Sequence, residues 1–153
     1  MRKSCAIIFC IIGMALISGC VGKEDSFMIT EIIFCTDEPS DRSYQQKSDS
    51  TYTQGEIIWI YLECFRCEVT MDREAYVAHL HTILEIVDDT ETCIKTESQS
   101  MEIPTTAHPI YIWLTFRVRT DALVPGTYTL SLTVEDTLSG ETATSWKAFS
   151  ITS

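Results

Sequence analysis

The sequence predicts an all-β fold: an antiparallel β-sandwich of about seven strands, with a small closed barrel as the alternative. Three observations lead to this prediction. Apolar and polar residues alternate in several β-prone runs, polar turn residues separate these runs, and no convincing helix longer than a turn or two follows residue 20. The chain has 153 residues, of which 45% are hydrophobic, so one domain with a sizeable core is expected.

The clearest element is a hairpin at the C-terminal end. Four apolar residues alternate with Thr and Ser in residues 126–134, which is the pattern of a strand with one buried face. Residues 136–140 supply turn-forming side chains, and residues 142–152 form a second β-prone run. Because a hairpin with one apolar face is not stable alone, this segment needs a partner sheet.

In the first part of the domain, the sequence predicts two strands separated by a long loop. Residues 27–35 are a β-rich run and the expected first strand. Residues 36–55 are polar and predict a loop, with a weak edge strand near Tyr52. Residues 56–63 are almost all apolar, which indicates a strand in the centre of a sheet. A helical turn is expected at residues 72–76.

The middle of the chain predicts three further strands. Residues 77–87 alternate between apolar and polar and predict a half-buried strand. Residues 92–96 are expected to form a short strand, and residues 98–109 a loop, because their two prolines exclude a central strand. Residues 110–119 alternate again and predict another strand facing the core.

The N-terminus has the layout of an export signal, in which a basic start is followed by an apolar run that is too short to span a membrane. The run ends in Leu16-Ile17-Ser18-Gly19-Cys20, which resembles the lipobox of prokaryotic lipoproteins. The resemblance implies cleavage before Cys20 and a lipid on its sulfur, with ordinary cleavage or an uncleaved helix as alternatives. The expected organisation is a signal peptide (residues 1–19), a lipidated cysteine with a short tether (20–26) and one β domain (27–153).

A second resemblance concerns the domain itself. The run Leu123-Val-Pro-Gly-Thr-Tyr-Thr-Leu-Ser-Leu-Thr-Val, with the hairpin that follows it, is similar to the last hairpin of immunoglobulin-like domains in prokaryotic surface proteins. It resembles archaeal and bacterial cell-envelope lipoproteins in particular. The resemblance implies an immunoglobulin-like β-sandwich at the extracytoplasmic face of the cell membrane. It concerns the fold, so it assigns no functional residue.

The charge and the missing motifs restrict the function. A formal net charge of −11 excludes nucleic acid as the expected partner, because phosphates would be repelled. The sequence contains no nucleophile elbow and no phosphate-binding glycine loop, and no cofactor is predicted. We therefore expect a non-catalytic binding or structural module whose partner is another envelope protein or a surface polymer. Core packing is expected for the three tryptophans, with Trp113 partly exposed: Trp59, Trp113 and Trp146.

Four cysteines remain after Cys20, and in an exported domain an even number suggests disulfides, here with three possible pairings. If the strands run up and down in order, Cys35 and Cys93 fall at the same end of the domain. This arrangement favours a Cys35–Cys93 bridge with Cys64–Cys67 as a local pair. Cys64 and Cys67 also match the C-x-x-C of thiol oxidoreductases, although such centres normally open a helix.

Three histidines supply a candidate metal site. His79 and His81 lie two residues apart on a predicted strand, so both side chains point to the same face. Glu85 lies further along that face, and His108 could approach from a loop. A His-x-His pair with a third ligand can bind zinc or copper. Two surface histidines on a polar face are the simpler interpretation, and a metal- or redox-active envelope protein is the alternative function.

Overall fold

The structure is a computed structural model and describes residues 26–153. The predicted signal peptide, the lipidation site at Cys20 and the tether up to residue 25 lie outside the described residues. In residues 26–153 the secondary structure consists of strands without any helix, which confirms the predicted all-β class. Accordingly, this part of the chain has no helix long and apolar enough to cross a membrane.

The smaller sheet has four strands and is organised around β4 (Ile57–Phe65), which is mostly buried. β8 (Tyr111–Arg119) pairs with β4 in antiparallel orientation over its full length, with Leu114 opposite Leu62. The other edge of β4 is shared by β1 (Met28–Ile29) and β2 (Ile33–Cys35). The predicted first strand at residues 27–35 is thus divided into two short strands that pair with different parts of β4.

The larger sheet has six strands, most of them antiparallel. It contains β3 (Thr51–Thr53), β10 (Glu141–Thr152), β9 (Gly126–Asp136), β6 (Ala75–Asp88), β5 (Val69–Asp72) and β7 (Cys93–Thr105). β9 and β10 form the predicted C-terminal hairpin, and β9 also pairs with β6. The edge strand expected near Tyr52 is confirmed as β3, which pairs in parallel with the end of β10.

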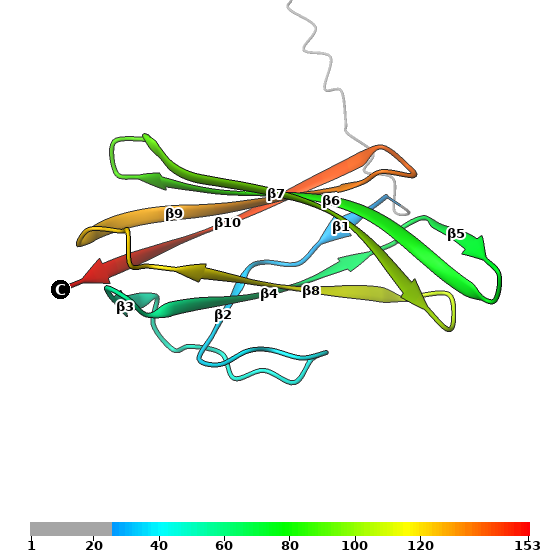
Figure 1. Cartoon of the computed structure of the whole chain (residues 1–153), viewed down its shortest axis with the longest axis horizontal. Coiled ribbons are helices and arrows are strands. Elements are labelled where there is room, and N and C mark those ends of the chain that lie inside the picture. Colours follow the sequence, from blue (N-terminus) through cyan, green and yellow to red (C-terminus); the bar gives the residue numbers. More distant parts are fainter. Residues whose placement is uncertain (1–25) are drawn as a thin grey trace, which may run out of the picture.

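The core lies between the two sheets, which pack face to face (Figure 1). Because side chains alternate along a strand, every second residue of each strand points into this layer. Fully buried examples from the two sheets are Ile58, Ile60, Leu62, Leu130, Leu132 and Val134. Burying each such side chain contributes roughly 1.5–3 kcal/mol.

Three expectations about the elements are wrong. The domain has ten strands rather than about seven. Residues 72–76 form no helical turn, because β5 and β6 are joined there as a hairpin with Arg73 in the left-handed region (φ 55°). Most of the loop expected at residues 98–109 belongs to β7. Pro104 is tolerated there because β7 is an edge strand, and an edge strand can lack an N–H on its unpaired side.

Candidate functional site

A groove runs between β7, at the edge of the six-stranded sheet, and β8, at the edge of the four-stranded sheet. It consists of three adjoining hollows of about 300, 390 and 470 Å³. The hollows are continuous, because Phe116 lines the first two and Thr115 lines the last two. Within the described residues β7 pairs only with β6 and β8 only with β4, so the groove lies between two unpaired strand edges.

One half of the groove is apolar. Met101 and Ile103 from β7 line it on one side, and Ile112 and Leu114 from β8 line it on the other. Met101, Ile103 and Phe116 are only partly buried and pack against the core from its open side. This half therefore offers apolar surface to a ligand without any rearrangement of the core.

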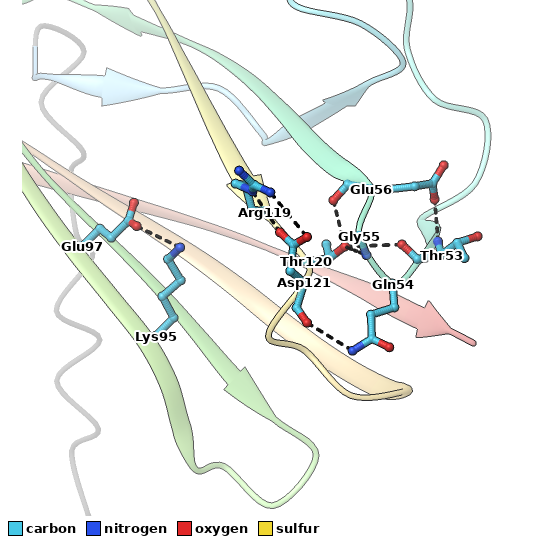
Figure 2. A network of polar contacts seen from close by, with 9 residues as sticks. All are labelled: Thr53, Gln54, Gly55, Glu56, Lys95, Glu97, Arg119, Thr120 and Asp121. Atoms are coloured by element: carbon cyan, nitrogen blue, oxygen red, sulfur yellow. Dashed lines mark hydrogen bonds and ion pairs between the residues drawn. The ribbon is translucent and has the colours of Figure 1, made fainter.

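The other half of the groove is charged. Lys95 on β7 forms an ion pair with Glu97 at 2.9 Å, and Arg119 at the end of β8 forms one with Asp121 at 2.9 Å (Figure 2). The Arg119 guanidinium donates to Asp121 and holds the pKa of that carboxyl below its usual value. Arg117 also lines this half and has no ion pair among the described residues. The charged half is therefore locally basic in a protein of net charge −11.

A buried threonine fixes the chain at this charged end. The Thr120 hydroxyl donates to the carbonyl of Glu56 at 2.8 Å and accepts from the backbone N–H of Gly55 at 2.9 Å (Figure 2). Gly55 has a φ of 96°, a backbone conformation that residues other than glycine rarely adopt. These bonds tie the end of β8 to the turn before β4, and so they position Arg119 beside the groove.

On the outer face of the four-stranded sheet lies a second polar cluster, which sequence reasoning missed. Arg42 donates two hydrogen bonds to the Glu63 carboxylate, at 2.6 and 2.8 Å, and its guanidinium lies 3.8 Å from the centre of the Tyr111 ring. Tyr61 donates to Glu63 at 2.9 Å, and Tyr111 donates to Asp41 at 2.7 Å. We call these five residues the Arg42 latch, because they hold the loop after β2 against β4 and β8.

The latch depends on an unusual turn. Asp41 and Arg42 both have positive φ, 27° and 55°, in a turn closed by two hydrogen bonds between the backbones of Ser40 and Ser43. Neither residue is glycine, so this turn carries strain that the latch contacts offset. Glu63 is only 8% exposed, and the bonds from Arg42 lower its pKa. The only sequence signal for the Arg42 latch was the carboxylate of Glu63 in the otherwise apolar run that forms β4.

The four cysteines of the domain are free thiols in the structure. The predicted Cys35–Cys93 bridge is not formed: Cys35 is buried on β2 of the smaller sheet, whereas Cys93 is exposed on β7 of the larger one. The up-and-down argument fails because the chain changes sheets between β4 and β6.

The Cys64–Cys67 pair is buried where β4 ends. A hydrogen bond between the two thiols and the burial of the site raise the pKa of Cys64. A buried thiol with a raised pKa is a poor nucleophile, so Cys64 differs from the exposed, low-pKa thiol that redox catalysis uses.

The histidines occupy ordinary polar positions. His79 and His81 lie on the outer face of β6, where His79 contacts the Thr70 hydroxyl at 3.0 Å and His81 contacts the Ser100 hydroxyl at 2.9 Å. His108 packs its ring against Tyr76 at 5.5 Å. Within residues 26–153 no group of three His, Cys, Asp or Glu residues is arranged to hold a metal ion.

The expectation of core packing fails for Trp146. This residue is 71% exposed on the outer face of β10, whereas Trp59 and Trp113 are half-buried, as was expected of Trp113. The alternation was correct, but in residues 142–152 it placed Trp146 on the opposite face from Phe149 and Ile151, which are buried.

Comparisons with known proteins identify no family. No protein-family model and no curated protein matches the chain. Among solved structures the chain is similar to a family 123 glycoside hydrolase from Clostridium perfringens, with 10% sequence identity and a TM-score of 0.46. The match covers 83% of this chain and 27% of the enzyme chain, so this chain spans less than a third of that enzyme's length. A likeness this weak supports no inference about function.

Proposed function

We propose that this chain is a lipid-anchored protein of the cell envelope, attached to the extracytoplasmic face of the membrane through Cys20. Its domain would be an immunoglobulin-like β-sandwich that binds another envelope protein without catalysis. The strand order supports this fold. β1 and β2, β4 and β8 face β10, β9, β6 and β7, as strands A, B and E face G, F, C and C′ in immunoglobulin domains. The lipobox-like ending at Cys20 supports the anchor.

The observation that supports binding most directly is the unprotected edge of β8. Its inward residues are all apolar, it contains no proline, and nine residues pair with β4 on one side only. Proteins normally protect such edges with inward-pointing charges, prolines or bulges. β7 carries these protections, since Lys95 and Glu97 border the groove and Pro104 lies near its end. The groove thus has one protected edge and one edge open to pairing.

An open strand edge beside an apolar groove accepts an extended polypeptide, which adds to the sheet through main-chain hydrogen bonds. Alternate side chains of the added strand would cover the apolar half, against Leu114 and Phe116. Arg117 would be available to an acidic side chain of that segment, because it has no ion pair among the described residues. The proposed partner is therefore an envelope protein with an extended segment that combines apolar and acidic residues.

Photo-crosslinking in intact cells tests this proposal. We would replace Thr115, which is exposed at the groove, with p-benzoylphenylalanine, and as a matched control replace Thr129, on the outer face of β9. We expect adducts from position 115 only, and the captured peptide should be extended and acidic. Arg117→Glu should abolish the adduct, and Arg117→Lys should retain most of it.

Two results would overturn the proposed function. The first is an equal yield of adducts from positions 115 and 129, which would indicate nonspecific capture. The second is an adduct at position 115 that Arg117→Glu leaves unchanged, because the basic end of the groove would then not contribute to recognition.

A further inference from the structure

Another hollow, separate from the groove, lies at the opposite edge of the larger sheet, away from β7. It has a volume of about 380 Å³ and lies between β10 and the segment that joins β1 to β2. Its lining consists of Glu31, Ile32, Thr144, Ser145, Trp146 and Lys147. This volume lies at the lower end of the range for small-molecule sites, roughly 300–1,000 Å³.

The surroundings of Trp146 are polar and small. Its cross-strand neighbour on β9 is Ser131, and its neighbours on the same face of β10 are Thr144 and Ala148. The hydroxyls of Thr144 and Thr133 contact each other at 2.9 Å beside it. Trp146, which is 71% exposed, is therefore a single aromatic residue among hydroxyl groups and does not belong to an apolar patch.

Two side chains of opposite charge complete the hollow. The Lys147 ammonium donates to the carbonyl of Ile32 at 3.1 Å, and since it has three N–H donors, it can donate further hydrogen bonds. Glu31 is exposed and supplies a carboxylate acceptor. One positive and one negative group leave the hollow with no net charge, which suits an uncharged ligand that both donates and accepts hydrogen bonds.

From this arrangement we propose that the hollow at Trp146 is a saccharide-binding site. A pyranose ring presents C–H groups on its face and hydroxyls around its rim. An exposed aromatic ring can stack on the face of the pyranose, while Thr, Lys and Glu side chains form hydrogen bonds with the hydroxyls around it. The site would accept a neutral sugar unit of a polysaccharide.

The same geometry disfavours a protein in this hollow. Aromatic anchors of protein interfaces are normally surrounded by other contact residues that exclude water, whereas Trp146 is surrounded by Ser, Thr and Ala side chains. Addition of a strand to β10 is also disfavoured. Lys147 is an inward-pointing charge on this edge, and Ile32 already bonds to it and to the Ser145 hydroxyl.

Titration of the full-length protein with three hexasaccharides tests this site: β-1,4-linked glucose, mannose and N-acetylglucosamine. Calorimetry should detect binding of at least one of them with a Kd below about 1 mM. Trp146→Ala should weaken that binding at least about tenfold, whereas Trp146→Phe, which keeps an aromatic ring, should lose much less. Because Trp146 is exposed, the melting temperature of Trp146→Ala should stay within about 2 °C of the wild-type value.

Ile110→Ala is the matched control, because Ile110 is 83% exposed and does not line the hollow. It should leave saccharide binding unchanged. The inference is overturned if none of the three hexasaccharides binds, if Trp146→Ala binds as the wild type does, or if Ile110→Ala causes the same loss. Arg117→Glu should not affect saccharide binding. The saccharide site can therefore be refuted while the proposed function of the groove stands, and the function of the groove can be refuted while the saccharide site stands.

Discussion

The Arg42 latch allows a quantitative prediction, because the two partners of its ion pair, Arg42 and Glu63, are buried to different extents. The Glu63 side chain is 11% exposed, whereas that of Arg42 is 54% exposed. Removing Arg42 leaves a sheltered carboxylate with only the Tyr61 hydroxyl as a side-chain partner, whereas removing the charge of Glu63 leaves a guanidinium that water can reach. The two single variants should therefore differ in stability although they break the same ion pair.

The magnitudes follow from the burial of Glu63. Leaving a fully buried carboxylate uncompensated costs about 3–5 kcal/mol, but water reaches this site once the guanidinium is gone, which reduces the cost to roughly 2 kcal/mol. Glu63→Gln keeps the shape and one acceptor, so we expect a loss of about 1 kcal/mol. The double variant Arg42→Met/Glu63→Gln should be more stable than Arg42→Met alone, because its buried group is neutral.

Urea unfolding followed by tryptophan fluorescence measures these differences. The bonds from Arg42 lower the pKa of Glu63 below the usual value for a glutamate. The latch should therefore stabilise the fold fully above about pH 4.5 and lose this effect as the pH falls through the lower folded-state pKa. The reasoning is refuted if Arg42→Met costs no more than Glu63→Gln at pH 7, or if the double variant is no more stable than Arg42→Met.

Two further predictions concern the backbone and the thiols. Gly55→Ala should cost about 1–2 kcal/mol in urea unfolding, because Gly55 has a φ of 96° and the added Cβ would strain the backbone. A clash contributes little, since the nearest described atom outside the neighbouring residues is Asp121 Oδ1, at 4.0 Å. Gly126→Ala should cost less, because the φ of Gly126 is not positive. In the reduced native protein, iodoacetamide should modify exposed Cys93 much faster than buried Cys35, measured by mass spectrometry of peptides. Equal rates at the two thiols would contradict the burial of Cys35.

The sequence predicted the class of the fold because alternation is a local property. Leu130 and Leu132 fall on one face of a strand whatever the strand pairs with, and their burial in the core follows from that alternation. The same rule gave the correct face for His79 and His81. The almost continuous apolar run at residues 56–63, which is also a local signal, indicated the buried strand β4. These inferences required no knowledge of which strands are neighbours.

The candidate sites could not be predicted, because they depend on contacts between distant residues. The groove exists because β7 and β8 are both edge strands. The two prolines in residues 98–109 predicted a loop there instead of an edge strand. The Arg42 latch joins residues that are 21 positions apart through a turn with positive φ at two residues other than glycine. Local patterns do not encode such turns reliably.

Local chemistry thus determined that this chain makes strands and which side chains share a face of each strand. Only the tertiary structure decided which sheet each strand joined, which edges stayed unpaired, and that Trp146 lies exposed beside Lys147 and Glu31. The physical reason is that strand pairing is set by the total burial of the two sheets, a sum over the whole chain that no short window of sequence contains.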